Sequence, residues 1–349
     1  MKNVSIASKT VGSDQPCFVI AEAGINHNGD MQLARRLVDA AKAAGADAVK
    51  FQTFEADKLV TALSPKADYQ KANTDQGETQ HDMLARVQLT EADHVELIEY
   101  CRKASIIFLS SPFHEEAAEL LARLKVPALK IPSGEITNLP YLAALARFGI
   151  PLIVSTGMST LAEVGKAIET IKQSGDPPVV LLHCLSNYPA DPAETNLRAM
   201  VSLASAFDVP VGYSDHTDGT DVAVAAVALG ACIIEKHLTL DRTLPGPDHL
   251  ASLEPQEFGR MVKSIRIVER ALGDGIKRPQ PSEMNTRAIA RKSVVAARDL
   301  AAGNVLRRED LAVRRPGTGL APDLIPTLVG RTLRVAIPAG TILGLEMLA

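Results

Sequence analysis

Short apolar runs alternate with longer amphipathic segments from residue 17 to about residue 272 of this 349-residue chain. The short runs are bounded by polar or turn-forming residues and have the length of buried strands. The predicted strands are Phe18–Glu22, Ala48–Gln52, Ile106–Ser110, Ala128–Ile131, Leu152–Thr156, Val179–Cys184, Val211–Ser214 and Cys232–Lys236. Strands that alternate with helices form parallel sheets, because each helix returns the chain to the same end of the sheet.

The longer segments between the predicted strands have helical character. In Met31–Gly45, apolar residues recur at near-helical spacing and the segment ends in glycine, which is typical of a helix C-terminus. Thr160 with Glu163 forms a capping-box pattern ahead of another segment, and Thr90 with Asp93 forms a weaker version.

Eight strand–helix pairs favour a closed (β/α)8 TIM barrel over a doubly wound sheet. No G-x-G-x-x-G follows the first strand, and the Gly24–Gly29 segment continues with Asp30 and Met31 where a phosphate-binding P-loop has Lys and Ser or Thr. The sequence therefore predicts an α/β barrel without dinucleotide or ATP chemistry.

The stretch GDGIKRPQPSEMN, from Gly273 to Asn285, is rich in glycine, proline and charge and is typical of an exposed linker. Short apolar runs punctuated by Gly and Pro follow it, and they predict a small β-rich domain. We expect a TIM-barrel domain over residues 1–280 and this second domain over residues 281–349. About 60 residues fold alone only marginally, so the small domain is expected to pack on its own barrel or on a second subunit.

Composition excludes several classes of partner. The net charge of -4 provides no basic surface for nucleic acid. The longest nearly apolar run, Val222–Ile234, is shorter than the roughly 20 residues that cross a bilayer, and the first residues lack a signal-peptide pattern, so we expect a cytoplasmic protein without a membrane partner. The four cysteines are widely spaced and are predicted to be reduced core thiols.

Polar or ionisable residues occur at the end of every predicted strand. In TIM-barrel enzymes the reacting groups come from these strand ends and the loops that follow. Charged groups beside buried strands cost a few kcal/mol unless they are paired, so packing alone does not explain the whole set, although single Glu–Lys pairs can simply brace a barrel. The strand-end residues are Glu22, Lys50, Gln52, Ser110, Ser111, Lys130, Ser133, Glu135, Ser155, Thr156, His183, Asn187, Tyr188, Ser214, Asp215, His216, Glu235, Lys236 and His237.

His216 and His237 end the neighbouring seventh and eighth strands, so their imidazoles could reach one divalent ion. Two histidines with open positions suit Mn2+ or a similar Lewis acid, whereas structural zinc requires four protein ligands. The alternative is a pair of hydrogen-bonded histidines without a metal. His183 is interpreted as a core histidine, and the roles of His27 and His249 stay open.

Lys50 and Lys130 allow two interpretations. They can hold an anionic substrate together with nearby hydroxyl and amide donors, or one of them can be a Schiff-base nucleophile. The anionic substrate is the simpler hypothesis, because two lysines and several hydroxyls are more than a Schiff base requires.

The strand-end motifs resemble those of the bacterial N-acetylneuraminate (sialic acid) synthase family, which includes legionaminic acid synthases. The motifs occur in the family's order over almost the whole chain: AEAGINHNGD, AVKFQTF, SSPF, LKIPSGEI, STGMST, LLHCLSNYPA, VGYSDHT, IEKHLTLDR, GPDHLASLEP and VRRPGTG. The resemblance implies a TIM barrel followed by an antifreeze-like (SAF) domain, in a domain-swapped homodimer in which each small domain caps the partner's active site. It also implies condensation of phosphoenolpyruvate with an N-acetylated mannose-type sugar.

Matched by motif position, the resemblance assigns roles to individual residues. His216 and His237 match the ligands of a divalent metal, Mn2+ or alternatively Mg2+ or Co2+. The implied phosphoenolpyruvate contacts are Lys50, Ser111, Lys130, Ser133, Ser155, Asn187 and Ser214. The implied sugar contacts are Gln52, Tyr188 and Asp248, the acidic catalytic positions are Glu22 and Glu135, and Arg315 matches the arginine that reaches the sugar's N-acetyl group from the partner's cap.

We therefore expect an N-acetylneuraminate synthase that uses N-acetylmannosamine or a related N-acetylated sugar. Within the family, the alternative is a legionaminic acid synthase that uses 2,4-diacetamido-2,4,6-trideoxymannose. Two alternatives outside the family are a Schiff-base pyruvate aldolase and an inactive barrel that carries an ice- or glycan-binding domain.

Overall fold

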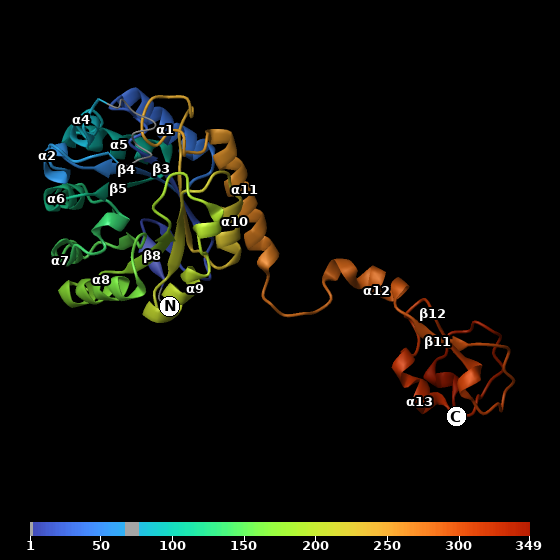
Figure 1. The fold of residues 1–349 in the computed structure, drawn as a ribbon. Coiled ribbons are helices and arrows are strands. Elements are labelled where there is room, and N and C mark those ends of the chain that lie inside the picture. Colours follow the sequence, from blue (N-terminus) through green and yellow to red (C-terminus); the bar gives the residue numbers. More distant parts are fainter. Residues whose placement is uncertain (1–2, 67–76) are drawn as a thin grey trace. The chain divides into compact units, whose positions relative to one another are not determined.

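The computed structural model describes residues 3–66 and 77–349 (Figure 1). The chain divides into two compact units, Met1–Gly273 and Asp274–Ala349. The boundary coincides with Gly273, which ends the last helix of the first unit at a positive φ of 62°.

Parallel strands close the first unit into a barrel in the order β10, β3, β4, β5, β6, β7, β8 and β9, which confirms the predicted TIM-barrel fold. Most observed strands lie within two residues of their predicted bounds. The strands are β3 (Phe18–Gly24), β4 (Ala48–Thr53), β5 (Ile107–Pro112), β6 (Leu129–Ile131), β7 (Leu152–Ser155), β8 (Val179–Cys184), β9 (Val211–Asp215) and β10 (Ile233–His237).

Helices surround this barrel and bury their apolar faces on the outer face of the sheet (Figure 1). The predicted Met31–Gly45 helix forms as α1 (Met31–Ala43), and both predicted capping boxes are present, at Thr90 with Asp93 and at Thr160 with Glu163. The other helices of this unit are α2 (Ala56–Leu59), α4 (Gln80–Ala85), α5 (Glu91–Ala104), α6 (Glu115–Arg123), α7 (Leu139–Ala146), α8 (Leu161–Ser174), α9 (Ala199–Phe207), α10 (Asp221–Ala228) and α11 (Pro255–Leu272).

The interior of the barrel is apolar at one end and polar at the other. Phe18, Ile20 and Ile233 belong to the apolar cluster at the N-terminal ends of the strands. A hairpin of β1 (Val4–Ile6) and β2 (Lys9–Val11) joins this cluster through Val4, Ile6 and Val11 and closes that end. The sequence analysis did not predict this hairpin. Further along the same inward faces, the side chains become polar, beginning with Glu22 on β3 and Glu235 on β10.

The second unit has its own small core, which includes Val294, Leu311 and Leu343. A short helix, α12 (Met284–Ala290), begins within the predicted linker. The strands β11 (Ser293–Ala296) and β12 (Leu311–Arg314) pair antiparallel, and isolated bridges such as Leu300 with Ile337 add further β-type pairing. The remaining helix is α13 (Ile325–Leu328).

Across residues 3–66 and 77–349, no helix is both long and apolar enough to span a bilayer. Cys17, Cys101, Cys184 and Cys232 are free and buried, as predicted for core thiols.

Candidate active site

A cavity of about 400 Å³ opens at the C-terminal ends of the barrel strands. Its position follows from the period of two along each strand, which directs alternate side chains into the barrel. The structure brings together there the following residues that the sequence analysis singled out: Glu22, Lys50, Gln52, Ser111, Lys130, Ser133, Ser155, Tyr188, Ser214, His216, His237 and Asp248.

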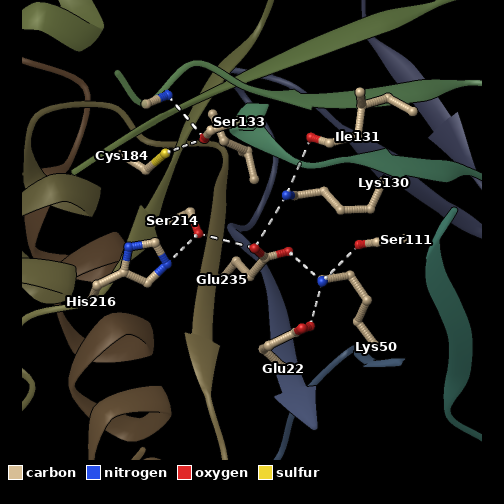
Figure 2. A network of polar contacts seen from close by, with 12 residues as sticks. Glu22, Lys50, Ser111, Lys130, Ile131, Ser133, Cys184, Ser214, His216 and Glu235 are labelled. Atoms are coloured by element: carbon tan, nitrogen blue, oxygen red, sulfur yellow. Dashed lines mark hydrogen bonds and ion pairs between the residues drawn. The ribbon is translucent and has the colours of Figure 1, made fainter. Parts of the chain in front are cut away.

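Two buried lysines lie on either side of Glu235 (Figure 2). The Nζ of Lys50 lies 2.5 Å from Oε2 of Glu22 and 3.9 Å from Oε2 of Glu235. The Nζ of Lys130 lies 3.4 Å from Oε1 of Glu235, which also accepts a hydrogen bond of 2.9 Å from the hydroxyl of Ser214. Charges from four different strands therefore meet in one buried network.

The two carboxyl groups of this network differ in how readily they take up a proton. Burial acts to raise the pKa of Glu235, but Lys130 and Lys50 outweigh it and lower the pKa to about 2. For Glu22, burial prevails over Lys50, and the negative charge of Glu235 adds to it, so the pKa rises to about 7. Glu235 therefore stays ionised, whereas Glu22 can hold a proton near neutral pH.

The two lysines also differ. Burial opposes the charge of Lys50, but Glu22 and Glu235 outweigh it and raise its pKa. Burial lowers the pKa of Lys130 by more than Glu235 raises it. An anion bound beside Lys130 would raise the pKa of this lysine and stabilise its positive charge, because Lys130 has less negative charge around it than Lys50.

Small residues form a polar cradle next to Lys130. The hydroxyl of Ser155 is buried and has no hydrogen-bond partner among the residues that the structure describes. The hydroxyl of Ser133 accepts a hydrogen bond of 3.0 Å from the backbone N–H of Gly157. A Cβ atom at Gly157 would come within 2.2 Å of the hydroxyl of Ser186, so only glycine fits there. Hydroxyls beside a buried cation are the donors that a phosphate or carboxylate requires.

The two histidines lie close together, with ring centroids 5.7 Å apart. The Nδ1 of His216 lies 2.6 Å from the backbone oxygen of Leu185, a contact in which Nδ1–H donates and Nε2 is left unprotonated. The Nδ1 of His237 is buried, and no group in the described part of the chain forms a hydrogen bond with it. Burial lowers the pKa of His216 to about 4 and, together with His216, lowers that of His237 well below its ordinary value, so both rings are neutral.

These rings fit a shared divalent ion. An ion bound at about 2.1 Å from a ring nitrogen lies about 3.2 Å from the ring centroid, so two rings around one ion can be up to about 6.4 Å apart. Neutral imidazoles are the form that binds metal, and the bond from His216 to Leu185 fixes its orientation as ligand-supporting contacts do. No group of three or more His, Cys, Asp or Glu side chains among the described residues is arranged to hold a metal, so the two histidines are the candidate ligands from these side chains.

Tyr188 and Asp248 complete the walls near the histidines. The ring of Tyr188 lies 4.1 Å from that of His216 and 5.6 Å from that of His237, measured between centroids. Burial raises the pKa of Asp248 to about 6, although Lys50 acts against it. Gln52 donates a hydrogen bond of 3.4 Å to Oε1 of Glu22.

A separate apolar wall lines one side of the cavity. It comprises Ile25, Leu59, Val60, Leu84 and Phe113, which pack in one cluster.

Comparison with known proteins identifies the family. The NeuB family model matches residues 37–277, and the SAF domain model matches residues 291–349. The chain belongs to the NeuB family. The N,N'-diacetyllegionaminic acid synthase of Legionella pneumophila is 52% identical over 96% of this chain and 95% of its own length. The enzyme of the same name from Campylobacter jejuni is 47% identical over 90% of this chain and 95% of its own length.

A solved NeuB-family structure shares this fold. The N-acetylneuraminic acid (sialic acid) synthetase of Leptospira borgpetersenii, crystallised in complex with citrate, is 34% identical with a TM-score of 0.73. The match covers 82% of this chain and 95% of the Leptospira chain. Both the barrel and the SAF domain that the sequence motifs imply are thus present.

Two predicted site residues of the barrel unit do not line the cavity, and a third lies in the second unit. Glu135 is half-buried and accepts a hydrogen bond of 2.7 Å from the side chain of Asn138, which caps α7. Asn187 is exposed, although its neighbours Ser186 and Tyr188 line the cavity. Arg315 belongs to the second unit, where its Nε donates a hydrogen bond of 3.0 Å to the backbone oxygen of Ala290.

Glu235 is the central residue that sequence reasoning left out of the NeuB-family site. Glu235 lies two residues before His237 in the sequence. The alternation along β10 that turns His237 inward therefore also turns Glu235 inward. The histidines left open have structural contacts: Nδ1 of His27 accepts from the backbone N–H of Gly29, and Nδ1 of His249 bonds to Thr239. His183 bonds to the backbone oxygen of Thr195, as expected for a structural histidine.

Proposed function

We propose that this NeuB-family chain condenses phosphoenolpyruvate with an N-acetylated mannose-type sugar and water, giving a nine-carbon acid and phosphate. Among sugars of this type, we propose 2,4-diacetamido-2,4,6-trideoxymannose, the precursor of legionaminic acid, rather than N-acetylmannosamine. The observation that carries the proposal is the convergence of two buried lysines, several serine hydroxyls and two neutral histidines on one cavity.

The anion cradle supports phosphoenolpyruvate as one substrate. This molecule has a phosphate and a carboxylate close together, and the two lysines lie on opposite sides of Glu235. Lys50 and Lys130 are proposed to hold these two groups, and the hydroxyls of Ser111, Ser133 and Ser155 to donate to their remaining oxygens. Asn187 and Ser214 stay proposed contacts from the family motifs.

His216 and His237 are proposed to hold the divalent ion, for which Mn2+ is favoured and Mg2+ and Co2+ are alternatives. Such an ion supplies Lewis acidity, which polarises the aldehyde of the open-chain sugar.

The carboxyl groups are proposed to manage the protons. C3 of phosphoenolpyruvate forms a bond to the aldehyde carbon, and the aldehyde oxygen takes up a proton, for which Glu22 is suited because its pKa is about 7. Water then adds to C2, with Glu135 proposed to take its proton. The C2–O bond to phosphate breaks last: phosphate leaves with the bonding electron pair and takes the proton of the new C2 hydroxyl, which becomes the keto group.

Two observations support the diacetamido sugar. The relatives that are 52% and 47% identical are named N,N'-diacetyllegionaminic acid synthases. The apolar wall offers a surface for the methyl groups of a 6-deoxy sugar with two acetamido groups. A sugar 6-phosphate would require further cations, and among the described residues that line the cavity only Lys50 and Lys130 carry a positive charge at neutral pH.

The SAF domain is proposed to cap the active site of a second copy in a domain-swapped homodimer, where Arg315 would reach the sugar's N-acetyl group. A cap of this kind would exclude bulk water while one water reacts at C2.

The proposal is tested with phosphoenolpyruvate labelled with ¹⁸O in the bridging position. Incubation with Mn2+ and the diacetamido sugar is expected to release phosphate that keeps the label, together with a nine-carbon acid seen by mass spectrometry. Unlabelled phosphate would mean P–O cleavage and would contradict the mechanism.

His216→Ala is expected to abolish metal-dependent turnover with the fold intact, and undiminished turnover would remove the histidine from the mechanism.

A further inference from the structure

Asp215 and Lys236 form a fully buried ion pair immediately before the two candidate metal ligands. The Nζ of Lys236 lies 2.7 Å from Oδ2 of Asp215, and both side chains are 0% exposed. Asp215 directly precedes His216 at the end of β9, and Lys236 directly precedes His237 at the end of β10. The two residues are also direct partners in the register of the parallel strands.

This pair lies on the opposite face of the sheet from the cavity. Ser214, His216, Glu235 and His237 line the cavity, whereas Asp215 and Lys236 do not. The period of two along a strand explains the difference, because successive side chains point to opposite faces. The side chains of the pair therefore lie outside the cavity, and they are joined to the histidines by the backbone of β9 and β10.

The same two side chains also tie down the turn that carries His216. Oδ1 of Asp215 accepts hydrogen bonds from the backbone N–H of Thr217, at 3.0 Å, and from its hydroxyl, at 2.8 Å. The Nζ of Lys236 also donates to the backbone oxygen of Thr217. His216 is thus held between two residues that are both bound to the strand of His237.

A buried ion pair is a poor way to gain stability, because desolvation of two charges offsets their attraction, and apolar replacements of similar size are often neutral or stabilising. Such a pair can instead specify one geometry among several compact alternatives. The two histidines that directly follow the pair have ring centroids 5.7 Å apart.

We propose that the Asp215–Lys236 pair is a positioning device that holds the two following histidines at the separation needed to share one divalent ion. The inference rests on the proposed metal site. Neither residue touches the ion or the substrate. Loss of the pair is expected to weaken metal binding by allowing the ends of β9 and β10 to move relative to each other.

The test is Mn2+ binding in the absence of substrates, measured from the electron paramagnetic resonance signal of the free ion during titration of the chelator-treated protein. The double variant Asp215→Asn/Lys236→Met removes both charges with little change in volume. We expect its Mn2+ affinity to fall by roughly 10- to 100-fold, as when a contact that orients a metal ligand is removed. Unchanged affinity in the folded double variant would overturn the inference.

A matched control separates positioning from general destabilisation. Arg266 bonds to Asp47 and to the backbone oxygen of Cys17 at the other end of the barrel, so Arg266→Met lowers stability far from the histidines. We expect it to bind Mn2+ like the parent protein. An equal loss of affinity in Arg266→Met would show that any destabilisation weakens the site and would contradict the inference.

Two further outcomes are distinguishable. If the double variant does not fold, Thr217→Val, which keeps both charges and removes only the hydroxyl's bond to Asp215, is measured in its place and judged by the same two results. If the parent protein binds no Mn2+, the proposed metal site itself fails. If the parent protein binds Mn2+ and the variants bind it equally well, only the proposed role of the pair is refuted.

Discussion

The Nζ of Lys50 lies 2.5 Å from Oε2 of Glu22 at the centre of the barrel, and both side chains are at most 4% exposed. A second carboxylate, Glu235, lies between this pair and Lys130. The barrel thus buries two cations with two carboxyl groups, one of which is readily protonated. With both carboxyl groups ionised, the network of two lysines and two glutamates has no net charge. When Glu22 takes up a proton, the network becomes positively charged, and this charge favours a bound anion.

Lys130→Met is expected to weaken phosphoenolpyruvate binding by roughly 10- to 100-fold, because a buried charge-assisted hydrogen bond is lost. Equilibrium binding measured by calorimetry checks this. Lys58→Met is the control, since Lys58 is exposed and pairs with the surface carboxylates Glu55 and Glu116.

The Schiff-base alternative makes a different prediction. Borohydride with pyruvate would trap a covalent adduct on the parent protein, whereas the synthase gives none.

Asn28→Gly is expected to raise the KM for the sugar by roughly 10-fold with little effect on phosphoenolpyruvate binding. Asn28 donates to the backbone oxygen of Pro245 at 2.8 Å and bonds to Nε2 of His249 at 3.3 Å, so it fixes the loop that carries the buried Asp248. Glycine keeps the positive φ of 52° but removes both bonds.

Asn196→Gly is the matched control, because Asn196 is exposed and also has a positive φ, of 44°. Steady-state kinetics with each substrate varied in turn gives the comparison. A large loss of phosphoenolpyruvate affinity in Asn28→Gly, or the same sugar effect in Asn196→Gly, would contradict the role assigned to this loop.

Site residues on strands could be predicted from the sequence better than site residues on loops. Lys50, Ser214 and His216 follow from strand ends, because the barrel and its period of two dictate where these side chains point. Glu135 and Asn187 were assigned from loop motifs, and a loop motif does not fix the direction of its side chains. Glu135 bonds to the helix cap Asn138, and Asn187 faces solvent.

The fold was predictable for a similar reason, and its omissions have physical causes. The barrel strands are apolar runs of clear length, whereas β1 and β2 have only three residues each, too short for a periodic pattern. Their burial comes from closing the barrel end, a tertiary effect that the local sequence does not encode. Glu235 was visible as a strand-end residue, and its distances to two lysines from other strands show its central place in the network.

His27→Phe is expected to make the protein less sensitive to acid. Burial lowers the pKa of His27 from 6.5 to about 4, so the unfolded chain binds a proton at a higher pH than the folded chain. This histidine therefore costs stability as the pH falls from 6.5 towards 4, by about 2 kcal/mol between about pH 7 and pH 5.

Phenylalanine does not titrate and keeps an aromatic ring near Phe51. It also loses the bond from Gly29, which lowers stability at neutral pH by about 1 kcal/mol. The measurement is the free energy of unfolding of parent and variant by denaturant, in the presence of a chelator, at about pH 7 and about pH 5. An equally steep loss of stability in parent and variant would refute the buried neutral state of His27.

Arg315→Ala is expected to raise the KM for the acetamido sugar far more than that for phosphoenolpyruvate. In the second unit, its Nε bonds to the backbone oxygen of Ala290. The neighbouring Arg314→Ala, at the end of β12, is the control and is expected to change neither value strongly. Equal effects of Arg315→Ala on both substrates would contradict its proposed contact with the N-acetyl group.

The choice of sugar is decided most directly by parallel measurement of kcat/KM for 2,4-diacetamido-2,4,6-trideoxymannose, N-acetylmannosamine and N-acetylmannosamine 6-phosphate, with phosphoenolpyruvate and Mn2+, followed by phosphate release. We predict the highest value for the diacetamido sugar, the lowest for the 6-phosphate, and no turnover after chelation. Preference for the 6-phosphate, or no phosphate release with any of the three sugars, would contradict the proposed function.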